Sequence, residues 1–129
     1  MIIRLPFPDR ALSPNRKAGR SWRTTAEAKA QARDAGFVAA KQALSQGPLQ
    51  SSADGWIPLS LVFVTPTKHR RDLDNMLGSA KHVLDGMAAG LGIDDSMFKP
   101  VLVDWVAGDK PGAIIAAVGV TIVSSVVVA

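Results

Sequence analysis

The chain of 129 residues contains no cysteine. This absence excludes disulfide bonds and thiolate chemistry, and it is typical of proteins that work in a reducing compartment, so we expect a cytoplasmic location. Histidine is nearly absent too, since the chain has only His69 and His82. Their separation of thirteen residues matches no common spacing of zinc ligands, and without cysteine to assist them a zinc site is not expected.

Long hydrophobic runs are also scarce, which bears on whether the protein enters a membrane. Residues 1–7 are too short, too evenly alternating and, with Pro6, too interrupted to resemble a signal peptide, and they predict a first β-strand. The eighteen residues 112–129 carry no charged side chain, but this run is marginal in length for a membrane span and rich in β-branched residues. We therefore predict a buried strand there and no membrane anchor.

The length of the chain predicts a single domain over residues 1–129 with room for a hydrophobic core. Residues 57–64 are rich in Leu, Val and Phe at strand length. Residues 101–106 and 113–123 are predicted to form a hairpin around a turn at 108–112. Together with two main helices, these segments predict an α+β fold with a mixed or antiparallel sheet of about four strands.

The first predicted helix covers residues 24–46. Thr24 and Glu27 form a capping-box pattern at its start, and Gly47 and Pro48 end it. Its apolar residues at helical spacing are mostly small: Ala26, Ala30, Phe37, Ala40 and Leu44. Small side chains permit close packing, so this face predicts a contact with the core rather than a cofactor slot.

The second predicted helix has carboxylates at both of its ends. Its apolar residues recur every three or four positions, as expected of one buried face: Leu73, Met76, Leu77, Ala80, Leu84, Met87 and Leu91. Asp72 and Asp74 begin this helix, and Asp94 and Asp95 follow the glycine stop at Gly92. One rigid helix would thus hold two acidic pairs, which meet if the chain after Gly92 turns back toward the helix start.

Two acidic pairs that meet predict a hard divalent cation. Carboxylates about 4 Å apart repel each other by roughly 4 kcal/mol at an effective dielectric constant near 20, and a cation reverses the sign of that energy. Mg²⁺ or Mn²⁺ fits, because both prefer oxygen ligands. An EF-hand does not fit, since its glycine and glutamate positions hold Leu77 and Val83. The alternative is structural, because Asp is common both as a helix N-cap and in a turn after glycine.

Basic residues are concentrated in two places. Residues 9–23 combine one acid, Asp9, with Trp22 and five cations: Arg10, Arg16, Lys17, Arg20 and Arg23. This composition favours a polyanionic partner. Lys68, Arg70 and Arg71 directly precede Asp72 and suit a phosphodiester substrate. The alternatives are a solvated basic loop and surface ion pairs between the arginines and the aspartates.

Four short motifs follow one another along the chain: Leu-Ser-Pro-Asn at 12–15, Arg-Arg-Asp-Leu-Asp-Asn at 70–75, Lys-His-Val-Leu-Asp at 81–85 and Gly-Ile-Asp-Asp at 92–95. In this order they resemble the RusA family of Holliday-junction resolvases, phage- and prophage-associated endodeoxyribonucleases of DNA recombination and repair. The resemblance implies a homodimer that cuts branched DNA, with Asn15 at the rim of the site. It also implies Mg²⁺, with Mn²⁺ as an alternative, bound by Asp72, Asp74 and Asp95, and a catalytic Lys81.

The chain departs from the family pattern at the lysine. Four residues after Asp74, where the family has its lysine, this chain has Gly78, and Lys81 comes seven residues after Asp74. Lys81 also stands four residues before Asp85, so the alternative is a surface ion pair between the two. Asp94 is the alternative to Asp95 as a ligand. Two other functions stay open: a junction-binding protein without catalysis, and a metal nuclease that acts on flaps or RNA.

Overall fold

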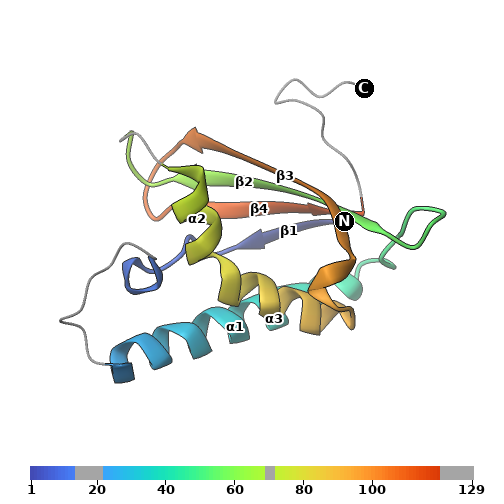
Figure 1. The fold of residues 1–129 in the computed structure, drawn as a ribbon, viewed down its shortest axis with the longest axis horizontal. Helices are drawn as coiled ribbons and strands as arrows, with labels where there is room; N and C mark the ends of the chain where they lie inside the picture. Colours follow the sequence, from blue (N-terminus) through green and yellow to red (C-terminus); the bar gives the residue numbers. More distant parts are fainter. Residues whose placement is uncertain (14–21, 69–71, 120–129) are drawn as a thin grey trace.

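The computed structural model describes residues 1–13, 22–68 and 72–119, which form one α+β domain (Figure 1). The strands are β1 (Ile2–Leu5), β2 (Ile57–Thr65), β3 (Phe98–Ala107) and β4 (Ala113–Val118). The α-helices are α1 (Trp22–Leu44), α2 (Leu73–Ser79) and α3 (Lys81–Leu91), and the 3₁₀ turns are η1 (Arg10–Leu12) and η2 (Asp95–Met97). The predicted fold class is confirmed. In these ranges no helix has both the length and the apolar character that crossing a membrane requires.

The four strands form one mixed sheet in the order β1-β4-β2-β3. Strand β4 lies between β1 and β2 and is antiparallel to both, while β3 is parallel to β2. The predicted hairpin of residues 101–106 with 113–123 is therefore wrong, because β2 separates the two strands, and residues 120–123 lie outside the described ranges. Strand β4 takes an inner position because it is the more apolar: five of its six residues are buried, whereas β3 has no fully buried residue.

The connection between β2 and β3 decides where the acidic residues lie. Ile57 pairs with Phe98 at one end of these parallel strands, and Thr65 pairs with Ala107 at the other. The chain must therefore leave the sheet after Thr65 and return to its opposite end before Phe98, and α2 and α3 make this crossing. Figure 1 shows α2 beside the end where β2 finishes, and the start of β3 at the far end.

The hydrophobic core lies between the sheet and the helices α1 and α3. These two helices approach each other so closely that only glycine fits at the contact. A Cβ atom added to Gly36 would overlap the carbonyl oxygen of Val83, and one added to Gly86 would overlap that of Arg33. The axes can therefore pack almost backbone to backbone, which fixes α3 along α1.

This glycine contact also sets the rotation of α1. Ala40 is fully buried as predicted, but Phe37 is 42% exposed, and Ala26 and Ala30 are exposed as well. The predicted apolar face of α1 is thus wrong over most of its length, because the side of the helix that carries Gly36 faces α3. The helix also begins at Trp22, two residues before the capping-box pattern at Thr24.

The second predicted helix is broken in two at Ala80, which ends α2 and precedes α3. Its buried residues continue across the break: Met76, Ala80, Val83, Met87 and Leu91. Leu73 and Leu77, however, are 39% and 37% exposed. The prediction of one rigid helix with one buried face is therefore wrong. Helix α2 packs against β3 at the edge of the sheet, where there is too little core to cover all of its apolar side chains.

Candidate acidic site

Asp72 and Asp74 start α2, beyond the end of β2. The Asp72 carboxylate accepts a hydrogen bond of 3.0 Å from the backbone N–H of Asp74, and so caps the helix. The Asp74 carboxylate is exposed and has no hydrogen bond or ion pair with any residue that the structure describes. The structural alternative, capping, is thus confirmed for Asp72, but it does not explain Asp74.

Asp94 and Asp95 lie at the opposite end of the sheet, just before β3. The Asp94 carboxylate accepts a hydrogen bond of 2.9 Å from the backbone N–H of Ser96 and caps η2, and this bond lowers the pKa of Asp94. The pKa of Asp95 is raised, chiefly because its carboxyl shares a hydrogen bond with that of Asp94. Both ends follow one pattern, in which the carboxylate of the first acid caps a helical turn and that of the second does not.

Lys81 forms an ion pair with Asp85, with 3.2 Å between Nζ and Oδ2, as its spacing of four residues predicts. The lysine side chain is 64% exposed, so this pair contributes less than about 1 kcal/mol. Asp85 also lies close to Asp95. A hydrogen bond with the Asp85 carboxyl and the repulsion of its charge both contribute to the raised pKa of Asp95. Through Asp85, Lys81 therefore belongs to the Asp95 end of the molecule and not to the Asp74 end.

The two acidic pairs do not meet within one chain. The seven residues of α2 and the eleven of α3, at about 1.5 Å each, place roughly 27 Å of helix axis between them. A shared Mg²⁺ needs its ligand oxygens only about 2.1 Å away. Across the described ranges, no three Asp, Glu or His side chains are grouped so that they could hold a metal.

The chain therefore does not turn back after Gly92 toward the helix start, and the condition under which the two acidic pairs would meet is not fulfilled. Because β2 and β3 are parallel, the acids that follow β2 and those that precede β3 must lie at opposite ends of the sheet. Asp72, Asp74 and Asp95 of a single copy do not fit around one ion. Their assignment as ligands stays a prediction, and the geometry excludes that all three bind the same ion within a single copy.

Most of the predicted DNA-binding residues lie outside the described residues: Asn15, Arg16, Lys17, Arg20, Arg70 and Arg71. Arg23 belongs to the first turn of α1. Lys68 is exposed, four residues before Asp72 and therefore at the same end of the sheet. Arg10 is exposed on η1. Of the three predicted DNA-binding residues that directly precede Asp72, the structure thus describes only Lys68.

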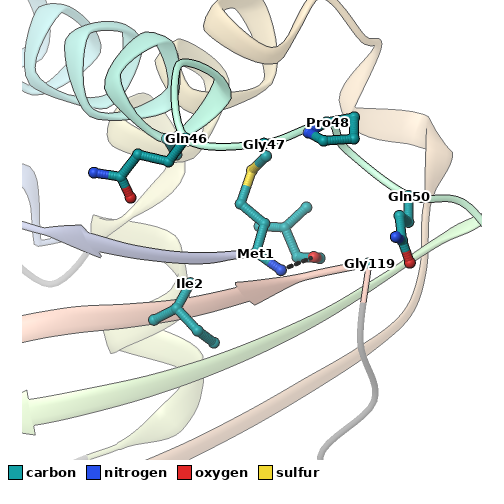
Figure 2. A pocket seen from close by; sticks show the side chains of 9 residues that line it. Met1, Ile2, Gln46, Gly47, Pro48, Gln50 and Gly119 are labelled. Atoms are coloured by element: carbon teal, nitrogen blue, oxygen red, sulfur yellow. Dashed lines mark hydrogen bonds between the residues drawn. The ribbon is translucent and has the colours of Figure 1, made fainter.

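The described cavities contain none of the predicted acids. One, of about 330 Å³, lies where α1 ends beside the start of β1, and it is lined by backbone, Met1, Gln46 and Gln50 (Figure 2). The N-terminal amine of Met1 donates a hydrogen bond of 3.1 Å to the carbonyl of Val118 in this cavity. A second, of about 250 Å³, lies between residues 6–12 and α1 and is mainly apolar. Neither cavity offers a cluster of titratable side chains for catalysis.

One aromatic and basic pair was not predicted from the sequence. The Lys99 ammonium lies 4.8 Å from the centre of the Trp56 ring, a cation–π contact. Trp56 precedes β2 and Lys99 is the second residue of β3, so the pair stands at the same end of the sheet as Asp95. The two residues are far apart in sequence, and only the parallel pairing of β2 with β3 brings them together.

Comparison with known proteins adds no activity. No protein-family model matches the chain. The chain is 38% identical over 96 residues to a protein of Xylella fastidiosa (strain Temecula1) described as uncharacterized. The match covers 74% of this chain and 61% of the relative, so the chain spans about three-fifths of that protein.

Proposed function

We propose that the protein is a Mg²⁺-dependent, structure-selective endodeoxyribonuclease that cuts four-way DNA junctions by hydrolysis of phosphodiester bonds. The motifs that resemble RusA resolvases motivate this proposal. The observation that carries it is the exposed carboxylate of Asp74, which caps nothing and has no partner among the described residues. It lies at the same end of the sheet as Lys68, on a chain of net charge +4, where an acid suits a cation and basic residues suit a phosphate.

Each residue has a distinct role in this proposal. Asp72, Asp74 and Asp95 are the carboxylates assigned to the ion, which, when bound, supplies Lewis-acid chemistry at the phosphate. Lys68 and the predicted basic residues hold neighbouring phosphates and orient the DNA backbone. Because the three acids are divided between two ends of each copy, one copy does not hold the complete set.

The test is cleavage of a synthetic four-way junction in the presence of Mg²⁺. We expect wild type to introduce paired nicks, and Asp74→Asn to lose at least about 100-fold in cleavage rate, since even the outer partners of metal sites contribute 10- to 100-fold. Asp34→Asn is the matched control, because Asp34 is also an exposed acid but lies on α1. Equal rates for wild type and Asp74→Asn, or cleavage that persists in excess chelator, would contradict the proposal.

A junction-binding protein without catalysis is the second candidate. The ion pair between Lys81 and Asp85 favours it, because this lysine is engaged away from Asp74. The same experiment separates the two functions: a binder retards the junction in a gel but leaves its strands intact. Flap and RNA substrates in parallel would reveal a nuclease of different selectivity.

A further inference from the structure

The mainly apolar cavity of about 250 Å³ between residues 6–12 and α1 has no part in the proposed chemistry. Its lining comes from three parts of the chain: residues 6–12, the middle of α1, and Ser79 and Val83 at the junction of α2 with α3. We propose that this cavity receives one unstacked nucleobase of the bound DNA, close to the branch point. The inference rests on the proposed function for the identity of the ligand as DNA, and it adds a base-binding site to the acidic one.

The size and the lining of the cavity suit a single planar base. Pockets for drug-sized ligands measure about 300–1,000 Å³, so a cavity of about 250 Å³ fits a smaller group. On the side of α1 the lining consists largely of Ala28, Ala32 and Ala35, whose side chains are single methyl groups and leave the space open. Enzymes that hold an unstacked base place its faces against apolar or aromatic side chains, and this lining offers such a surface.

The lining also includes an aromatic ring that is held in place. Phe7 makes an edge contact with Phe63, with ring centroids 6.4 Å apart and an interplanar angle of 87°. Phe63 is fully buried, so it gives Phe7 a rigid support. Pro6 and Pro8, on either side of Phe7, restrict the backbone. A wall that is already formed loses little conformational freedom when a ligand binds, which favours stacking of a base.

Polar groups at the cavity can bond to the edge of a base. Asp9 and Gln31 are exposed, so solvent and ligands reach the cavity between them. One Asp9 oxygen accepts a hydrogen bond of 2.8 Å from the Ala11 N–H, and the carboxylate has a second oxygen for a base amine. The Gln31 amide offers donors and an acceptor. The Ser79 hydroxyl donates to the Met76 carbonyl at 2.7 Å, and its oxygen can accept a further bond.

The cavity lies beside the helix that begins with the acids. Turn η1 contacts both α1 and α2, which holds residues 6–12 against these helices (Figure 1). Ser79 ends α2 five residues after Asp74, about 7.5 Å along the helix axis. Arg10 is exposed on η1, next to Asp9, where a cation suits a backbone phosphate. A phosphate at the start of α2 and a base in the cavity can therefore belong to one short stretch of a strand.

A branch point supplies the base that such a cavity needs. Taking a base out of a duplex costs unstacking and unpairing energy, and this cost is lowest where the base is already poorly paired or single-stranded. Where strands change partners, the stacking of the arms is interrupted, whereas an intact linear duplex has no such position. The cavity would therefore favour branched over linear DNA, which gives the structure selectivity of the proposed nuclease a physical basis.

The test removes a base and leaves its phosphate. Four-way junctions carry one abasic site each, at successive positions around the branch point, and their affinity is measured in a chelator so that no strand is cut. We expect one position to weaken binding to wild type by about 10-fold, as expected for the loss of one stacked base. In Ala35→Leu, whose larger side chain fills the cavity, this position should have no effect. Ala30→Leu is the matched control, because Ala30 is exposed on α1 but does not line the cavity.

A second variant tests the cavity without adding bulk. Gln31→Ala removes an exposed amide at the opening and should reduce the abasic effect, while Gln42→Ala, exposed on α1 outside the cavity, should not. Urea denaturation shows whether Ala35→Leu is folded, and cavity-filling substitutions commonly stabilise a protein. An equal response to every abasic position in wild type, or the same position-dependent loss in wild type and both cavity variants, would overturn the inference.

Free deoxynucleoside monophosphates separate the two sources of a base. Methyl NMR signals of Ala32, Ala35 and Val83 report on the cavity, with inorganic phosphate as the control. Shifts with nucleotides but no abasic effect would assign the cavity to free nucleotides and overturn its role in DNA binding. If junctions are cut but abasic sites act equally in wild type and Ala35→Leu, the base site is wrong and the nuclease stands. If the abasic effect depends on the cavity but no junction is cut, the proposed function is wrong and the base site stands.

Discussion

At the scale of single residues, Asp72 has a structural task that can be separated from its proposed chemical one. Its carboxylate caps α2 through the N–H of Asp74. Asn caps about as well as Asp, whereas Ala does not, and the loss of a cap costs about 1 kcal/mol. Asn also lacks the negative charge that a metal ligand needs.

We therefore expect Asp72→Ala to lose about 1 kcal/mol of unfolding free energy and Asp72→Asn to lose little, while both lose junction cleavage. Urea denaturation and cleavage rates measured on the same preparations give the comparison. Full activity of Asp72→Asn would mean that this residue serves only as a cap.

At the scale of secondary-structure elements, the position of α3, and with it the placement of Asp85, depends on its contact with α1. Gly86 faces the backbone of α1 so closely that a Cβ there would overlap the Arg33 carbonyl. Gly47, just beyond α1, has no atom within 4 Å of an added Cβ. The two glycines therefore form a matched pair of sites for the same substitution.

We expect Gly86→Ala to destabilise the fold by about 2–3 kcal/mol, because one helix must shift to admit the methyl group. Gly47→Ala should change the unfolding free energy by less than about 0.5 kcal/mol. Urea midpoints with unchanged slopes would measure both. A tolerated Gly86→Ala would show that α1 and α3 can separate at little cost.

At the scale of the whole molecule, the open edge of the sheet at β3 is one surface through which the homodimer implied by the RusA resemblance could form. Val101 on β3 and Val38 on α1 are both exposed apolar residues, at 45% and 52%. A lysine is easily accommodated at either position in a single copy, because its stem lies on the surface and its ammonium stays in water. On an edge strand, however, lysine is a common obstacle to pairing.

We expect Val101→Lys to sediment as a folded monomer and to lose paired cleavage, while Val38→Lys stays dimeric and active. Analytical ultracentrifugation of both variants beside wild type measures the effect. A dimeric Val101→Lys protein would place the interface elsewhere.

The fold could be predicted in part because some of its information is local. The apolar run at 57–64 predicts β2, and the polar and glycine-rich flanks of the last helix predict where α3 ends, since strand and helix periods are read over a few neighbouring residues. The capping roles of Asp72 and Asp94 are local as well, because each acid bonds an N–H two residues ahead. The ion pair of Lys81 with Asp85 follows from one turn of helix.

The remaining features depend on contacts between distant segments. The sequence by itself determined the α+β class, the main elements and the presence of two acidic pairs, because these follow from composition and short-range periodicity. Only the tertiary structure decided that β4 inserts between β1 and β2, that Gly36 and Gly86 set the rotation of α1, and that the acidic pairs lie apart. The physical reason is that strand partners are chosen by burial across the whole sheet. Once β3 lies parallel to β2, the chain has to cross the domain between them, and it carries Asp74 and Asp95 to opposite ends.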